Sequence, residues 1–168
     1  NSIVNERYDK SFLNHRYLFS FGENISAKII IKDINKDINY INTVYEIFLD
    51  KNTTIDIIFE SENPQTTQLT NFVSTLNRGS TLNIYVIDIS GKLIKKNYFI
   101  NLKEENTTCN YKGINLIRNN DHIDKYIQLN HKNQYTYSAV DQKNILDEKS
   151  KSIFYSKAII DKDCLHSE

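Results

Sequence analysis

Residues 118–168 read RNNDHIDKYIQLNHKNQYTYSAVDQKNILDEKSKSIFYSKAIIDKDCLHSE, and this stretch carries the pattern that decides the fold. Runs of β-branched and aromatic residues cover 123–129, 135–140 and 153–160, and polar residues separate them. Short runs of this composition, bounded by Asn, Asp and Ser, are typical of β-strands. The stretch therefore predicts successive short strands joined by tight turns.

The same pattern extends toward the N-terminus. Further runs occupy 28–32, 40–48, 53–60, 69–75, 81–88, 93–100 and 109–117. Alternation with period two is clear in several runs, for example where Leu82, Ile84 and Val86 share one face of a strand. We expect an all-β fold in which one face of each strand points inward. The best helix candidate, 141–152, is predicted to be loop and strand.

Polar segments between the runs are predicted turns. They cover 33–39, 50–52, 61–65, 77–80, 90–92, 103–106 and 119–122. The chain has only four Gly and one Pro, so Asn and Asp must supply most of the left-handed turn conformations. Turns of this kind suit a β-sandwich, a jelly roll and a β-helix equally, and the residues alone leave these three folds open.

The run 153–160 also predicts which side chains face the core. Phe154 shares one face with Ser156, Ala158 and Ile160, whereas Tyr155 shares the other face with Lys157. The lysine marks the second face as the wetter one. We therefore expect Phe154 in the core and Tyr155 exposed.

Charge and composition exclude some functions. The chain of 168 residues carries 21 Lys and Arg against 21 Asp and Glu, so no net field attracts nucleic acid or an anionic membrane. No apolar run is long enough for a membrane helix. The lysines at 92, 95 and 96 are predicted to form a solvated strand edge. We expect one soluble domain without a nucleic-acid or membrane partner.

Cysteine usage and glycosylation signals say little about a secreted role. Cys109 and Cys164 lie far apart, unlike the dense spacing of a disulfide framework, so a reducing, cytoplasmic location is expected. Three Asn-x-Ser/Thr sequons, at Asn24, Asn52 and Asn106, are no more than chance gives at this Asn content. We attach no function to them.

The only candidate metal ligands are Cys164 and His166. They lie two residues apart and share one face if the segment is a strand. The alternative is a buried apolar cysteine beside a surface histidine. Because an iron–sulfur cluster needs about four thiolates and the chain has two, we expect this chain alone to hold no cluster and no other cofactor.

No residue set predicts catalysis. Ser138 and His131 lack a nucleophile elbow, and the carboxylate pairs at 104–105 and 147–148 point apart in strands. A glycine-rich phosphate loop is absent from the sequence. His122 and His131 are expected to be structural, and the chain is expected not to be an enzyme.

The C-terminal third resembles the core domain of the SufB/SufD family, the iron–sulfur cluster assembly scaffold proteins, and is most similar to the SufD branch. The resemblance is carried by the order of His122, Asp124, His131, Ser138, Lys143, Ile145, Leu146, Asp147, Ser150, Phe154, Lys157 and Asp161. Val140, Asn144 and Tyr155–Ser156 depart from the family pattern, but Asn and Ser can still form the turns, so the fold is expected to be retained. The resemblance implies a right-handed parallel β-helix (solenoid) of SufBD-core type over residues 1–168, incomplete at both ends.

The resemblance also implies a function and partners. The chain would be a non-catalytic SufD-like scaffold subunit in the SUF system, forming a heterodimer with a SufB-like subunit. The full SufB–SufC–SufD complex would handle the iron–sulfur cluster, and a SufC-like ATPase would dock only through family helices that lie beyond Glu168. The alternative function is a β-solenoid or jelly-roll domain that binds or processes polysaccharide.

Overall fold

The computed structural model describes residues 12–34, 38–162 and 164–168, and within these it contains β-strands and turns but no helix. None of the described segments is thus a helix that could cross a membrane. The strands are β1 (Phe12–Phe21), β2 (Ser26–Ile34), β3 (Tyr40–Leu49), β4 (Thr54–Leu76), β5 (Thr81–Leu102), β6 (Thr108–Ile117), β7 (His122–His131), β8 (Tyr137–Leu146) and β9 (Lys151–Ile160).

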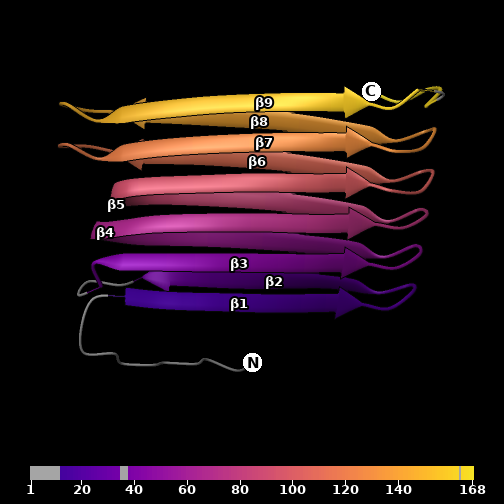
Figure 1. Cartoon of the computed structure of the whole chain (residues 1–168), viewed down its shortest axis with the longest axis horizontal. Coiled ribbons are helices and arrows are strands. Elements are labelled where there is room, and N and C mark those ends of the chain that lie inside the picture. The colour runs from indigo at the N-terminus through magenta and orange to yellow at the C-terminus, as the bar shows by residue number, and fades with distance from the viewer. Residues whose placement is uncertain (1–11, 35–37, 163) are drawn as a thin grey trace.

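The strands stack in two parallel sheets that form a solenoid. One sheet, near the viewer in Figure 1, contains β1, β3, the second half of β4, the second half of β5, β7 and β9. The distant sheet contains β2, the first halves of β4 and β5, β6 and β8. The near strands run to the right, the distant strands return to the left, and the chain climbs from β1 to β9. This winding is right-handed, so the parallel β-helix prediction is confirmed.

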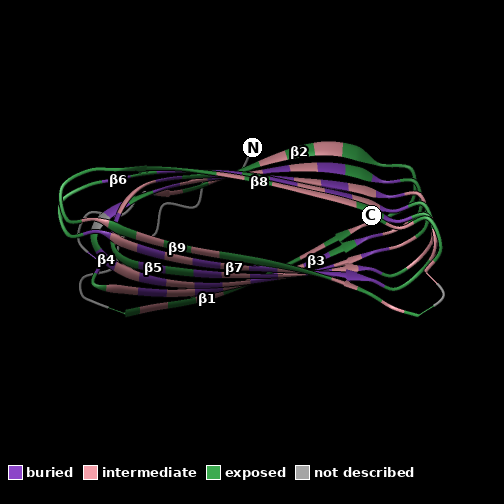
Figure 2. Cartoon of the chain, turned by 90° about the horizontal axis from the view of Figure 1, so that it is seen from above, coloured by how far each residue is buried: buried purple, intermediate pink, exposed green. Residues whose placement is uncertain are grey.

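Inward side chains from both sheets fill the space between them. Along the strands, buried and more exposed residues alternate, as Figure 2 shows in a view along the stack. The core holds a row of contacting aromatic rings, from Tyr45 through Phe59, Phe72 and Tyr98 to Tyr111. Each coil covers the apolar side chains of the coil before it, which is how a solenoid builds one continuous core.

Turns at one end of the coils, the right in Figure 1, repeat one backbone conformation. A residue with positive φ occurs once per coil, at Asn24, Asn52, Gly79, Asn106, Tyr135 and His166. The next residue carries a hydroxyl in most coils, and Thr53, Ser80, Thr107 and Thr136 are fully buried. The sequons at Asn24, Asn52 and Asn106 therefore coincide with three of these turns. Asn suits these positions because it tolerates the left-handed region better than most residues.

Three other features test the strand predictions. Strand β1 was not predicted, although its inward residues Phe19 and Phe21 alternate with more exposed neighbours. The predicted turns at 61–65 and 90–92 are corners inside β4 and β5, where strand pairing continues across shifts in register. The facing of β9 is confirmed, since Phe154 packs partly buried against the core while Tyr155 is 55% exposed.

Candidate functional site

A row of polar side chains points into the solenoid at the end opposite the repeated turns. Each coil of the distant sheet contributes one residue, and successive members are register partners. We call this row the polar column; its members are Asp33, Ser61, Asp88, Asn115 and Asn144. Such a column is costly unless every member finds a hydrogen-bond partner inside the protein.

The centre of the polar column is a buried charged cluster. Asp88 Oδ1 accepts a hydrogen bond from Lys96 Nζ at 2.5 Å, and Lys125 Nζ forms an ion pair with Asp88 Oδ2 at 2.8 Å. All three side chains are at most 4% exposed. Lys96 and Lys125 come from the near sheet, where they are register partners in β5 and β7. The carboxylate thus joins the two sheets and two consecutive coils.

Burial and charge act in opposite directions on this cluster. Burial would raise the pKa of Asp88, but Lys96 and Lys125 outweigh burial and hold that pKa below its ordinary value. Burial lowers the pKa of Lys125, and the attraction of Asp88 counteracts part of that effect. The carboxylate is therefore ionised at neutral pH and supplies the negative charge that both lysines need.

Amide and hydroxyl groups extend the polar column on both sides of the charged cluster. Lys125 Nζ donates to Asn115 Oδ1 at 2.5 Å, and Asn115 Nδ2 donates to Asn144 Oδ1 at 2.7 Å. In the earlier coils, Ser61 Oγ donates to Gln68 Oε1 at 3.0 Å, and Gln68 Nε2 donates to an Asp33 carboxylate oxygen at 2.7 Å. Residues of the two sheets thus satisfy one another across the interior.

The charged cluster was not predicted from the sequence, and one of its members was placed on the wrong side of its strand. Lys96 was predicted to lie on a solvated edge with Lys92 and Lys95, and that prediction was wrong, because Lys96 is only 3% exposed. Lys95 does face outward, where it pairs with Asp124 at 3.6 Å. The available signal was the alternation itself, since Lys96 occupies the same face of β5 as the buried residues at 94, 98 and 100. By the same alternation, Asp88 and Lys125 share a strand face with buried residues.

The candidate metal ligands do not share a strand face. Cys164 and His166 lie in a turn, so the condition under which they would point the same way is not met. Cys164 Sγ is 3.5 Å from the His131 carbonyl oxygen, and the His166 ring stacks on Tyr135 with centroids 5.1 Å apart. Across the described part of the chain, no group of three or more His, Cys, Asp or Glu side chains could hold a metal ion.

His131 joins the last two coils through both of its ring nitrogens. Nδ1 lies 2.7 Å from Thr136 Oγ1, and Nε2 lies 3.0 Å from Ser138 Oγ. Thr136 Oγ1 also lies 3.1 Å from the Asn133 carbonyl oxygen and 2.9 Å from Ser167 Oγ. Burial lowers the pKa of His131, which favours the neutral ring. These contacts support the structural role expected for this histidine.

Cys109 lies in the core of the distant sheet, in register with Ser138. Complete burial raises the pKa of its thiol to about 12. The thiol is therefore protonated at neutral pH, whereas metal and cluster ligation require the thiolate.

Comparison with known families decides where this solenoid belongs. The family model for the SufBD core domain of SUF system FeS cluster assembly matches residues 3–168. The chain belongs to the SufBD core family. This membership supports a role in SUF iron–sulfur cluster assembly and does not favour the polysaccharide alternative. No curated protein and no solved structure is similar enough to this chain to count as a match.

Proposed function

We propose that this SufBD core acts as a non-catalytic, SufD-like scaffold subunit that pairs with a SufB-like subunit and works with a SufC-like ATPase. The observation that carries the proposal is the family match over residues 3–168, combined with a solenoid in which the matched strands pair without interruption from β1 to β9. A continuous, rigid stack suits a protein that holds partners in place.

The interior chemistry supports a scaffold role more than a cluster-binding one. Lys96 and Lys125 both pair with the buried carboxylate of Asp88 in the interior. Cys109 is a buried, protonated thiol, and Cys164 lies in a turn where it contacts the His131 carbonyl. The iron–sulfur cluster is cargo of the assembly system, and this chain would contribute to the assembly through its surface.

The SufD-like assignment, in preference to a SufB-like one, rests on the order of residues from His122 to Asp161 and on the small number of cysteines. A subunit that holds a nascent cluster needs several thiolates in one place. We therefore expect the SufB-like partner to provide the ligands of the cluster and the ATPase to provide the nucleotide chemistry.

Co-expression with SufB-like and SufC-like proteins tests the proposal. The tagged chain should retain the SufB-like protein, and should not retain the ATPase when the SufB-like protein is left out. After anaerobic reconstitution with iron and sulfide, the complex should carry a cluster whose content is the same in Cys164→Ser and Cys109→Ser variants. Retention of neither protein would refute the assignment to this complex. A cluster lost in Cys164→Ser would show that this chain supplies a ligand and is not SufD-like in that respect.

A further inference from the structure

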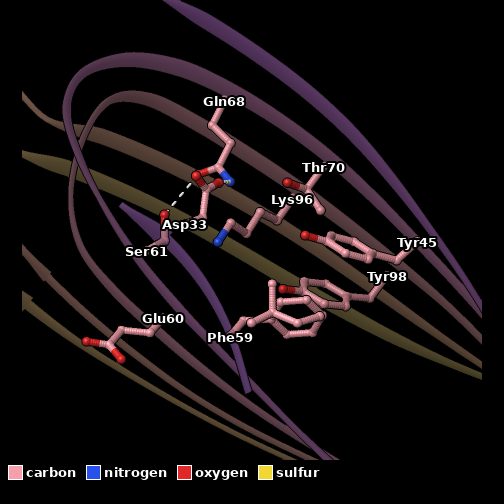
Figure 3. A pocket seen from close by; sticks show the side chains of 10 residues that line it. Asp33, Tyr45, Phe59, Glu60, Ser61, Gln68, Thr70, Lys96 and Tyr98 are labelled. Carbon is pink, nitrogen blue, oxygen red and sulfur yellow. Dashed lines mark hydrogen bonds between the residues drawn. The ribbon is translucent and has the colours of Figure 1, made fainter. Parts of the chain in front are cut away.

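A small polar cavity lies beside the charged cluster, where the polar column runs from Asp33 and Ser61 to Asp88. Its volume is about 10 Å³. Figure 3 shows Lys96 pointing into its centre, with Asp33, Ser61 and Gln68 on one side and the hydroxyls of Thr70, Tyr45 and Tyr98 on the other. A volume of this size accommodates one water molecule when two to four polar groups surround it.

Two groups that line the cavity need a further hydrogen-bond partner. Thr70 is only 4% exposed, and its Oγ1 has no hydrogen-bond partner among the described residues. Lys96 carries three N–H donors, and Asp88 accepts from one of them. A buried polar group without a partner destabilises the folded state. Such a group is therefore rare in a stable interior.

The charge around the cavity identifies the kind of occupant. The ammonium group of Lys96 disfavours a cation at this place. The site has no excess positive charge that would attract an anion. Two carboxylates, Asp33 and Asp88, lie in the same region as Lys96 and Lys125. A neutral molecule that both accepts from an ammonium and donates to a hydroxyl fits these surroundings.

We propose that this cavity binds one structural water molecule that accepts a hydrogen bond from Lys96 Nζ and donates one to Thr70 Oγ1. Tyr45 and Tyr98 line the same space. The water completes the coordination of a buried ammonium group and so allows a charged residue to occupy an interior position. The inference concerns the interior of this chain and does not depend on the proposed partners.

The sign of a stability change distinguishes a bound water from an unsatisfied hydroxyl. If the water is present, Thr70→Val removes one of its partners and should lower the denaturation midpoint. If Thr70 Oγ1 has no partner at all, the same change removes an unsatisfied polar atom and should raise the midpoint. Ser74→Ala is the matched control, because Ser74 is also buried on β4 with no hydrogen-bond partner for its Oγ among the described residues, yet it does not line the cavity.

Two measurements test the proposal on the full chain. Denaturation should show a lower midpoint for Thr70→Val and an unchanged or higher one for Ser74→Ala. A crystal structure that resolves ordered solvent should show a water peak within hydrogen-bond distance of Lys96 Nζ and Thr70 Oγ1, and crystals soaked in bromide should show no anomalous signal there. A raised midpoint in Thr70→Val, a cavity without density, or an anomalous bromide peak would each overturn the inference.

Discussion

The two ends of each coil fill the narrow interior with different kinds of side chain. At the end of the repeated turns, the inward residues of the distant sheet are mostly apolar, as at Ile55, Leu82 and Cys109, and the opposing near sheet offers Leu76 and Leu102. At the other end, the polar column faces Gln68, Lys96 and Lys125. We refer to these regions as the apolar end and the polar end.

The difference shows that burial and polarity are separate properties of a solenoid interior. Both ends follow the same period-two alternation, and both bury their inward residues. Apolar contacts are non-directional, so the apolar end tolerates any side chains that fill the space. The polar end works only if each donor meets an acceptor at a fixed distance, because an unpaired buried charge is strongly unfavourable. The polar end therefore specifies the register between coils more strictly.

The largest expected effect comes from breaking the charged cluster. Asp88→Asn leaves Lys96 and Lys125 buried without a counter-charge and should lower the free energy of unfolding by about 3–5 kcal/mol. Asp56→Asn is the control, because Asp56 accepts its hydrogen bond from Asn83 on the outer face, and it should cost about 1 kcal/mol or less. Urea denaturation measures both.

A triple variant separates the charge from the packing at the polar end. Asp88→Leu combined with Lys96→Met and Lys125→Met replaces the ions with apolar side chains. It should be more stable than Asp88→Asn, because replacement of a whole buried ion cluster is often neutral or stabilising. If the triple variant is as unstable as Asp88→Asn, uncompensated charge is not the cause of the instability of Asp88→Asn.

The second-largest expected effect concerns Phe154, at which the inward row of the near sheet changes from charged to apolar. In the inward row of the near sheet, Lys96 and Lys125 are followed by Phe154, which packs partly buried against the core. Phe154→Ala should cost about 2 kcal/mol, less than a fully buried aromatic would. Tyr155→Ala, which loses an exposed ring stacked on Tyr126, should cost about 0.5–1 kcal/mol. Equal costs in a denaturation series would contradict the facing of β9.

A third effect concerns the turns beside the apolar end. Asn106 has φ near 58°. This left-handed conformation costs most residues with a Cβ about 1–2 kcal/mol, but Asn and Asp adopt it more readily, and Gly has no Cβ to clash. We expect Asn106→Ala to lower stability by about 1 kcal/mol and Asn106→Gly to leave it nearly unchanged. Thermal unfolding of the pair checks this. A glycine variant as unstable as the alanine variant would show that the Asn side chain, and not the backbone conformation, matters.

The smallest effect is a pH dependence at the apolar end, where the imidazole of His131 is buried. Its pKa in the folded state lies below the ordinary value of about 6.5, so the unfolded chain binds the proton more readily. Stability is then complete above about pH 6.5 and declines as the pH falls below it. His131→Asn should flatten this part of the pH profile. An unchanged profile in the variant would assign the dependence to other groups.

Local sequence determined the strands, their facing and the chemistry of the turns. Alternation at Leu82, Ile84 and Val86 and the inward position of Phe154 follow from the geometry of a single strand, in which successive side chains point to opposite faces. The Asn residues of the turns follow from the conformations that their backbone tolerates. These properties need no knowledge of distant residues, and the right-handed solenoid followed from a resemblance to a family.

Only the tertiary structure decided which polar residues meet. Asp88 pairs with Lys96 from the same strand β5 and with Lys125 from the next coil, and nothing local distinguishes Lys96 from its exposed neighbour Lys95 except the parity of its position. Coil length sets the register between coils, and the corners of β4 and β5 set which inward rows of the two sheets oppose each other. Hydrogen bonds across the interior depend both on the register between coils and on which inward rows oppose each other. The polar end therefore forms only when the coils are stacked.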